Sequence, residues 1–421
     1  MTTNCLYPCT IFTQLVRGNS YIKIPRVVYT PTSTLQKEGI MTNAEKIINY
    51  HDINAINHID DTHQAMKSNY LADSRPWVIA YSGGKDSTLV LQLVYELLLA
   101  LNPEDRKPVY VIASDTRVEA PIIADYVINS LQQLADHAKQ SGIDVTVHLV
   151  QPEIENSFWT NIIGKGYPPP NRWFRWCTSK LKIKPIRLVI DDITAKYGSV
   201  ILLLGSRKAE SGNRSRSIEK REYNSRGLNP HHEIPNALVM QPIVNWKTDE
   251  VWEYLFTHNP APWDISHDRM LELYRQANSS ECPVVTDLNT PACGGSRFGC
   301  WTCTVVSKDK SMAGFISSGD EWMTPLYDFR NWLKEYREDE STRNVFKRNG
   351  QPGPGPFKTS ARQLILEKLL AVEQEVNREL ISDDELIEIQ KLWTKEFDTL
   401  HTALKTAFRY NRKPMKKQSN A

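Results

Sequence analysis

Residues 76–88 read PWVIAYSGGKDST. The short apolar run Trp77–Tyr81 is typical of a buried strand, and the apolar stretch that begins at Thr88 predicts a helix. The segment between them, Ser82–Ser87, contains two glycines, two serines and a lysine. A glycine-rich turn between a strand and a helix N-terminus points several backbone N–H groups at one place. The stretch therefore predicts a phosphate-binding turn.

The pattern of this turn is not that of a Walker A loop. Asp86 stands where Ser or Thr should follow the lysine, and Ile79 stands where the first glycine belongs. Ser-Gly-Gly-x-Asp-Ser instead resembles the pyrophosphate loop of the N-type ATP pyrophosphatases, which sulfonucleotide reductases share. The alternative is a tight glycine turn without a ligand. The resemblance implies that ATP binds to Ser82, Gly83, Gly84, Lys85, Asp86 and Ser87.

Apolar runs and helical patterns alternate after this turn. Strands are expected at 77–81, 109–114, 145–150 and 200–205, helices at 86–101, 119–141 and 183–197, and a further strand and helix at 237–244 and 248–258. Such alternation predicts an α/β fold with a doubly wound parallel sheet. The resemblance implies the adenine nucleotide α-hydrolase (HUP-like) version of that fold.

The expected domains follow from composition. They are an N-terminal arm with helices (1–72), the nucleotide domain (73–260), a cysteine-rich region (261–348) and, after a Gly/Pro linker, a helical extension with a basic tail (357–421). Residues 259–325 are expected to be loop-rich. Within the extension, a break between helices is expected near Ser382-Asp383-Asp384.

Two further polar turns follow predicted strands. Ligands of doubly wound sheets bind beyond the carboxyl ends of the strands, so the turns at Asp115-Thr116 and at Gly205-Ser206-Arg207 are expected to join the loop at Ser82. The second turn opens the pattern G-x-R-x-x-E-S-x-x-R. An arginine fork binds phosphate bidentately. The additional predicted nucleotide contacts are Asp115, Thr116, Gly205, Arg207, Glu210 and Arg214.

These motifs, with Trp246–Trp252, occur in the order found in the phosphoadenylyl-sulfate reductase family, and the resemblance covers about residues 75–260. It implies that Lys85, Asp86 and Arg207 act in catalysis. Lys85 would neutralise the charge on the leaving phosphates, and Asp86 or Asp115 would hold Mg²⁺.

Seven cysteines in a long chain argue for metal or redox use rather than a disulfide framework. Cys300 and Cys303 form a close pair, and Cys177 precedes a lysine-rich segment. Thiolates in this pattern suit a four-iron cluster or a structural zinc, and unliganded core cysteines are the third option. The family resemblance favours a [4Fe–4S] cluster on Cys177, Cys300, Cys303 and Cys293, with Cys282 as the alternative fourth ligand; the CxxxC pair Cys5 and Cys9 has no assigned role.

The distribution of basic residues predicts further binding sites. The net charge is only +2, but residues 156–190 contain seven basic and no acidic side chains, and the tail from Arg409 contains five more basic residues. Both are candidate sites for phosphates or nucleic acid. No apolar run is long enough to cross a membrane and no signal peptide is recognised, so a cytoplasmic protein is expected.

The combination of pyrophosphate loop, reductase-like core and the segment RFGCWTCTVV is most similar to the sulfurtransferase-like ATP pyrophosphatases of bacterial DNA phosphorothioation. The resemblance implies DNA, a cysteine desulfurase and the other proteins of that system as partners. A sulfonucleotide reductase is disfavoured because no cysteine follows Cys303 in this sequence to act as nucleophile. A transfer-RNA thiolase and a non-catalytic, nucleotide-sensing iron–sulfur scaffold are the remaining alternatives.

Overall fold

The structure is a computed structural model that describes residues 58–210, 212–221, 223–231, 233–277 and 298–414. The described residues belong to one compact unit, Lys46–Ala421. The expectations for residues 1–57, including Cys5 and Cys9, lie outside the described residues. Among the described residues, none of the helices combines the length and the apolar character that a membrane span requires.

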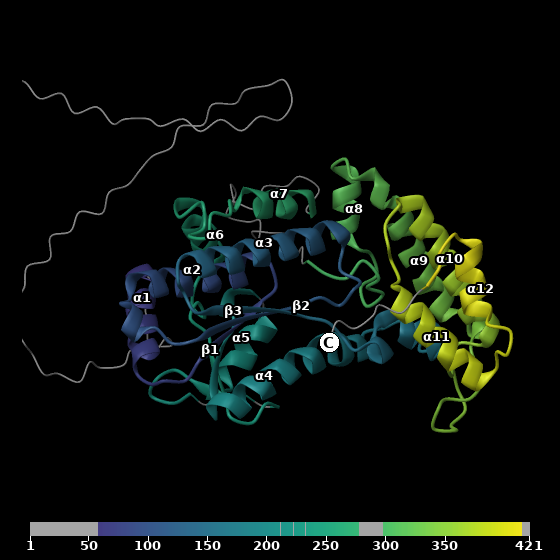
Figure 1. The fold of residues 1–421 in the computed structure, drawn as a ribbon, viewed down its shortest axis with the longest axis horizontal. Coiled ribbons are helices and arrows are strands. Elements are labelled where there is room, and N and C mark those ends of the chain that lie inside the picture. The colour runs from purple at the N-terminus through teal and green to yellow at the C-terminus, as the bar shows by residue number, and fades with distance from the viewer. Residues whose placement is uncertain (1–57, 211, 222, 232, 278–297, 415–421) are drawn as a thin grey trace, which may run out of the picture. The chain divides into compact units, whose positions relative to one another are not determined.

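The core is a six-stranded sheet with the order β3-β2-β1-β4-β6-β5 (Figure 1). Its strands are β1 (Trp77–Tyr81), β2 (Val109–Ser114), β3 (Val145–Val150), β4 (Val200–Leu203), β5 (Asn229–Pro230) and β6 (Ala237–Met240). All neighbours are parallel except the edge pair β5 and β6. The predicted doubly wound α/β sheet is therefore confirmed. The strand order reverses direction at β1, which pairs with β2 on one side and β4 on the other.

Both faces of the sheet are buried along its central strands β1, β2 and β4, as is typical of parallel sheets. Alternate residues of one strand belong to two different apolar clusters, because side chains alternate across a strand. In β1, Trp77 and Ile79 pack with α2 (Lys85–Ala100), whereas Val78 packs with Ile190 of α4 (Lys184–Tyr197). Figure 1 shows α2 and α3 (Pro121–Gln140) on one side of the sheet and α4 on the other.

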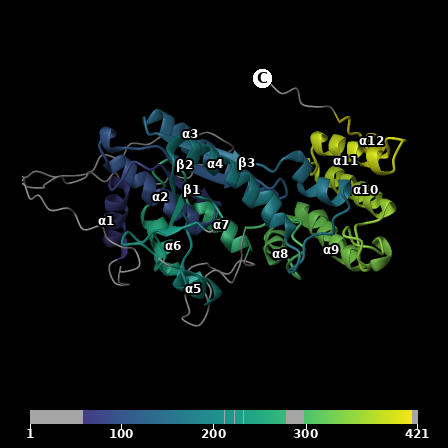
Figure 2. The same ribbon diagram turned by 90° about the horizontal axis from the view of Figure 1, so that it is seen from below.

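The remaining helices flank this core. They are α1 (His58–Leu71), α5 (Gly212–Glu219), α6 (Thr248–Thr257), α7 (Asp268–Ala277), α8 (Lys310–Ser317), α9 (Thr324–Glu338), α10 (Thr359–Val376), α11 (Asp383–Glu396) and α12 (Thr402–Arg409). Figures 1 and 2 show α9–α12 gathered together beside the sheet. The predicted break near Ser382 is confirmed: Ser382 caps α11, and its hydroxyl accepts a hydrogen bond from the backbone N–H of Glu385.

Two local expectations differ from the structure. The sequence favours Thr248 as the N-cap of the helix expected at 248–258. Lys247 instead caps α6, and the Glu250 carboxylate accepts a hydrogen bond from the Lys247 backbone N–H at 2.6 Å. Residues 259–325 were expected to be loop-rich, but α7 and α8 lie within them. Helix α7 forms because Met270, Leu273, Tyr274 and Ala277 recur at helical spacing and are all buried.

Candidate functional site

The turn after β1 is closed by its two serines. The Ser87 hydroxyl donates to the Gly84 carbonyl at 2.9 Å and accepts from the Ser82 backbone N–H at 3.1 Å. The two serine Oγ atoms lie 3.0 Å apart. Ser82 is exposed, whereas Ser87 is buried at the first turn of α2. The predicted strand–turn–helix is thus present, and it leaves an exposed hydroxyl and a helix N-terminus at the carboxyl edge of the sheet.

Two glycines are required by this geometry. Gly83 has a φ of +73°, which L side chains rarely adopt, and a Cβ there would lie 2.4 Å from Cγ2 of Val127. Gly205, in the turn after β4, lies against the turn after β1. A Cβ on Gly205 would lie 2.7 Å from the carbonyl oxygen of Asp86 and 2.9 Å from the backbone nitrogen of Ser87. The structure therefore brings together two of the three predicted turns by direct backbone contact.

Charged side chains join the same two turns. The Asp86 carboxylate accepts a hydrogen bond from Nε of Arg207 at 2.7 Å through one oxygen and lies 3.1 Å from Nζ of Lys85 through the other. Arg207 is only 1% exposed. Its remaining donors contact the Trp246 carbonyl at 3.1 Å and the Thr248 hydroxyl at 3.3 Å. Arg207 thus connects the turn after β4 with the turn after β1 and the start of α6.

The neighbouring predicted residues are placed as follows. The Glu210 carboxylate accepts from the Arg207 backbone N–H at 3.2 Å, so it organises the turn after β4. Arg214 falls on α5. The nucleotide-binding roles of both residues stay predictions.

Tyr274 is a site residue that the sequence reasoning missed. It comes from α7, and its hydroxyl accepts a hydrogen bond from the Lys85 backbone N–H at 3.3 Å. The Lys85 ammonium also lies 5.5 Å from the centre of the Tyr274 ring. The helical periodicity around Met270 was the sequence pattern that would have identified α7 as a helix.

Asp115 lies at the end of β2, the neighbour of β1. It accepts hydrogen bonds at 2.8 Å from the Gln151 amide and from the Arg117 backbone N–H. These donors are neutral, whereas Asp86 already faces two cations. Of the two carboxylates predicted to hold Mg²⁺, Asp115 is therefore the better suited to a divalent cation.

The cysteine segment lies directly against the turn after β2. Residues 118–120 and 299–301 run antiparallel, and the Trp301 backbone N–H donates to the Val118 carbonyl at 3.0 Å. The Thr116 hydroxyl lies 3.4 Å from Sγ of Cys300, and the Thr116 backbone N–H donates to the Glu119 carboxylate at 2.8 Å. A predicted nucleotide contact and a predicted cluster ligand are therefore in contact.

Cys177 reaches the same region from the segment after β3. It precedes the helical turn η5 (Thr178–Ile183), in which the Leu181 carbonyl accepts from the hydroxyl of Ser114 at 3.2 Å. Lys182 of this turn lies 3.5 Å from Glu119. Electrostatic interactions connect Cys177 with Cys303, and Lys182 with Cys300 and Cys177. Three of the four predicted ligands therefore face one region.

Thiolates are the ligands that a soft metal or an iron–sulfur cluster requires. Burial raises the pKa of Cys300 to about 12, with a further contribution from Glu119, so without a metal this thiol is protonated at neutral pH. Among the described residues, three or more His, Cys, Asp or Glu side chains are nowhere close enough together to form a complete metal site. Cys293 and Cys282, from which the fourth ligand was predicted, lie outside the described residues.

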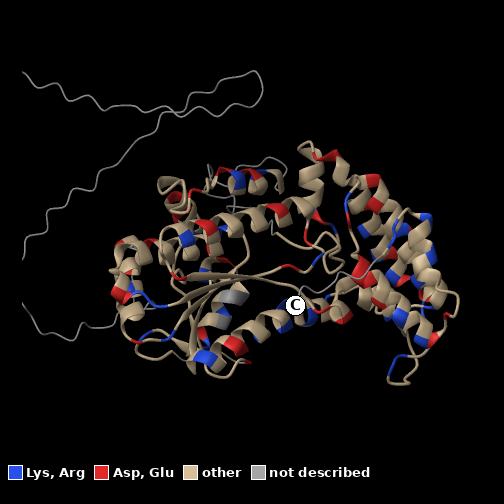
Figure 3. Cartoon of the chain, in the orientation of Figure 1, with Lys and Arg blue, Asp and Glu red and all other residues tan. Residues whose placement is uncertain are grey.

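The predicted basic surfaces are partly neutralised by nearby acids. In the first block, Lys182 pairs with Glu119 at 3.5 Å and Lys184 with Glu153 at 2.6 Å. In the tail, Arg412 contacts the carboxylates of Glu373 and Asp383, and Arg409 pairs with Glu367 at 3.4 Å; Lys416 and Lys417 lie outside the described residues. Figure 3 shows both signs of charge distributed over α9–α12.

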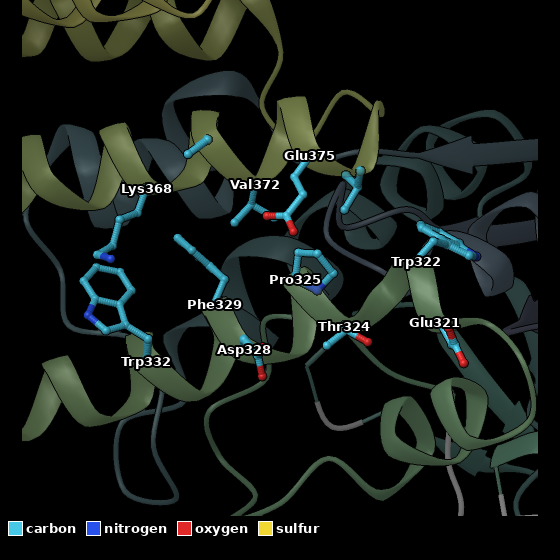
Figure 4. Close-up of a pocket in the computed structure, with 12 residues that line it drawn as sticks. Glu321, Trp322, Thr324, Pro325, Asp328, Phe329, Trp332, Lys368, Val372 and Glu375 are labelled. Carbon is cyan, nitrogen blue, oxygen red and sulfur yellow. The ribbon is translucent and has the colours of Figure 1, made fainter.

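A pocket between α9 and α10 lies apart from these turns (Figure 4). Trp322, Phe329 and Trp332 line it, with Lys368 and Glu375 from α10. The Lys368 ammonium lies 5.0 Å from the centre of the Trp332 ring. None of the site residues predicted from the sequence lines this pocket.

Two curated proteins are similar to this chain in sequence. An uncharacterized protein of Methanocaldococcus jannaschii is 27% identical over 307 residues, which are 72% of this chain and 47% of that protein. The adenosine 5'-phosphosulfate reductase of Salinibacter ruber is 28% identical over 152 residues, which are 36% of this chain and 48% of that enzyme. The chain thus spans about half the length of the curated relatives it matches.

Among solved structures, the phosphoadenylyl-sulfate reductase of Candida auris in its phosphate complex aligns with a TM-score of 0.31 and 16% identity. That alignment covers 50% of this chain and 84% of the Candida auris chain. The phosphoadenosine phosphosulfate reductase domain matches residues 76–306, which is more than half of the 421 residues and includes all three turns and the Cys300–Cys303 pair. The chain therefore belongs to the phosphoadenosine phosphosulfate reductase domain family.

Proposed function

We propose that this protein is an ATP-dependent sulfurtransferase that acts on the DNA backbone, of the type represented by DndC in bacterial DNA phosphorothioation. One observation carries the proposal: the Thr116 hydroxyl and Sγ of Cys300 lie 3.4 Å apart. The turn after β2, which we propose binds the nucleotide, therefore adjoins the cysteine group, by which we mean Cys177, Cys300 and Cys303. An enzyme that activates an acceptor with ATP and then adds sulfur needs both groups within reach of the same phosphorus atom.

The first step activates the acceptor. A non-bridging phosphate oxygen of DNA attacks the α-phosphorus of ATP, and the bond to the β-phosphate oxygen breaks. Pyrophosphate leaves, and the DNA phosphate becomes joined to AMP. The turn Ser82–Ser87 would bind the pyrophosphate, and the Lys85 ammonium would stabilise the negative charge that develops on it.

The second step exchanges oxygen for sulfur. A sulfur nucleophile at the oxidation level of hydrosulfide attacks the activated DNA phosphorus, and AMP leaves with the former DNA oxygen. One proton is released and no electrons are transferred. The buried pair Asp86–Arg207 would keep Lys85 aligned throughout, and Asp115 would hold Mg²⁺ against the phosphates.

The cysteine group would handle the sulfur. A [4Fe–4S] cluster on Cys177, Cys300 and Cys303, with Cys293 or Cys282 as a fourth ligand, would supply a site at which sulfide binds close to the nucleotide. A cysteine desulfurase is the proposed sulfur donor. Within this chain, Lys182 lies beside both Cys177 and Cys300 and would balance the negative charge of their thiolates.

A reaction with isotopically labelled sulfide and ATP tests the proposal. Anaerobically purified protein would be given plasmid DNA, transfer RNA or a sulfonucleotide in separate reactions. We expect label in DNA as a nuclease-resistant phosphorothioate, with one pyrophosphate released per sulfur. Label in transfer RNA would replace the proposal with a thiolase. Sulfite release from the sulfonucleotide would favour the reductase that the Salinibacter ruber relative suggests.

A further inference from the structure

One loop presents aromatic side chains to solvent beside the cysteine group. In the segment Asn171–Arg175, which we call the aromatic loop, Trp173 is 82% exposed and Phe174 is 45% exposed. Burying such side chains is strongly favourable, so a loop that keeps them in water is unusual. The guanidinium of Arg172 stacks over the Trp173 ring at 4.8 Å, and Arg175 is exposed.

The exposure is built into the loop. The Asn171 carboxamide oxygen accepts hydrogen bonds from the backbone N–H groups of Trp173 and Phe174 at 2.9 and 2.8 Å. The base of the loop is anchored, because the Pro170 carbonyl accepts hydrogen bonds at 2.6 Å from both Thr304 and the buried Arg337. The tip therefore projects from a fixed base.

A group of cations adjoins the loop, and it joins two lysines of the basic block 156–190 to Arg348, which lies far from them in the sequence. The Arg348 guanidinium lies 4.7 Å and the Lys180 ammonium 5.8 Å from the centre of the Tyr167 ring, which in turn lies 6.3 Å from the ring of Phe174. Arg348 also donates to the Lys165 carbonyl. Arg348 and Lys180 thus lie over one aromatic ring, and Lys165 adjoins Arg348; we call these three residues the cation group.

These cations repel one another. Burial lowers the pKa of Lys165, and the charges of Lys180 and Arg348 lower it further, while Glu155 and Glu388 act in the opposite direction. Gathering like charges is unfavourable, and a bound anion would relieve the repulsion. The surface is also close to the sulfur site, because Thr304, which anchors the loop, follows Cys303 directly, and Arg175 acts electrostatically on Cys177.

We propose that the aromatic loop and the cation group bind a single strand of nucleic acid, with Trp173 and Phe174 stacking on unpaired bases and the cation group contacting phosphates. Exposed aromatics next to a track of cations are the features that bind unpaired strands, since every base has a face to stack on. The identification of this strand as the DNA acceptor rests on the proposed function. Strand binding itself is independent of it.

The test measures binding by fluorescence polarisation on the anaerobically purified protein, without ATP, using a labelled DNA single strand, its duplex and the RNA of the same sequence. We expect the DNA strand to bind more tightly than the duplex, and the double substitution W173A/F174A to weaken strand binding at least about 25-fold. The triple substitution K165A/K180A/R348A should make the fall of log affinity with log salt concentration less steep, by about 2 in the magnitude of the slope.

Matched controls lie elsewhere on the molecule. Phe408→Ala removes a 56% exposed ring of α12, and Lys139→Ala removes an exposed cation from the last turn of α3. Both should leave binding unchanged. Unchanged strand affinity in W173A/F174A would overturn the proposal. The proposal would also be overturned if W173A/F174A lost binding to anionic phospholipid vesicles but still bound the strand.

The result with RNA tests the binding surface separately from its assignment to a DNA acceptor. If the protein binds the RNA strand instead of the DNA strand, and the same variants lose this binding, the proposal of a nucleic-acid-binding surface stands. Its assignment to a DNA acceptor would then be overturned. Intact strand binding without sulfur incorporation into DNA would overturn the proposed function and leave this surface standing.

Discussion

The Asp86 carboxylate accepts a hydrogen bond from Nε of the buried Arg207 at 2.7 Å, and its other oxygen lies 3.1 Å from the Lys85 ammonium. Asp86 thus holds together a cation of the turn after β1 and a cation of the turn after β4. We therefore expect the central Asp of the loop to act as a positioning residue that holds the Lys85 ammonium in place.

Breaking this buried pair should be costly. Arg207→Met leaves the Asp86 carboxylate with one fewer cation and removes the hydrogen bond from Arg207 to the Trp246 carbonyl, so we expect the free energy of unfolding to fall by about 3 kcal/mol or more. Denaturant unfolding measures this change. Arg187→Met, which removes an exposed pair with Asp191 on α4, should cost less than about 1 kcal/mol. Equal losses of unfolding free energy in the two variants would show that the buried Asp86–Arg207 pair stabilises the fold no more than an exposed pair.

The contact at Gly205 makes a second prediction. The added Cβ of Gly205→Ala would lie 2.7 Å from the Asp86 carbonyl oxygen, so the turn after β4 must move away from the turn after β1. We expect ATP affinity to fall at least about tenfold, which corresponds to about 1.4 kcal/mol, as measured by calorimetry. Gly212→Ala is the control, because a Cβ there meets nothing within 4 Å. An unchanged affinity in Gly205→Ala would mean that the two turns do not form one nucleotide site.

Tyr274 should support the loop through its hydroxyl. Tyr274→Phe keeps the ring but removes the acceptor for the Lys85 backbone N–H, which is worth about 1 kcal/mol or a fivefold change in affinity. We expect weaker ATP binding without loss of secondary structure. Tyr336→Phe, on α9, serves as the matched control. If both variants bind ATP like the parent protein, α7 has no part in the site.

His267, just before α7, predicts a pH dependence. Burial lowers its pKa from 6.5 to about 4, and its Nδ1 is buried without a hydrogen-bond partner. Below pH 6.5 the unfolded chain binds a proton that the folded chain does not, so stability should fall as the pH decreases from 6.5 to 4 and then level off. This contribution amounts to about 3 kcal/mol.

Denaturant unfolding across that range measures the effect, and His267→Gln should flatten the pH profile. His401→Asn, at an exposed position, should leave the profile unchanged. A parent-like profile in His267→Gln would assign the pH dependence to other groups.

Much of the fold was predictable because its parallel strands are short apolar runs between helical patterns. Strands β1 to β3 have the predicted bounds, and β4 ends two residues earlier than expected, at Leu203. Helix α7 was missed because its apolar residues are spaced among charged ones, so that the segment resembles a polar loop when read residue by residue.

The site was predictable only where its residues share a motif. The turns at Ser82, Asp115 and Gly205 were expected at one edge of the sheet, and two of them are in direct contact. The pairing of Lys182 with Glu119, and of Arg348 with Tyr167, joins residues that are far apart in the chain. Such contacts depend on packing between elements, which no local pattern encodes.

Cleavage of ATP by the Lys85→Ala variant tests the central claim most directly. With DNA and sulfide present, we expect the parent protein to convert ATP to AMP and pyrophosphate. We expect Lys85→Ala to lose this activity while keeping its bound iron and visible absorbance, and Cys300→Ser to lose iron and sulfur incorporation. Undiminished pyrophosphate release by Lys85→Ala would contradict the assignment of the turn after β1 as the catalytic phosphate site.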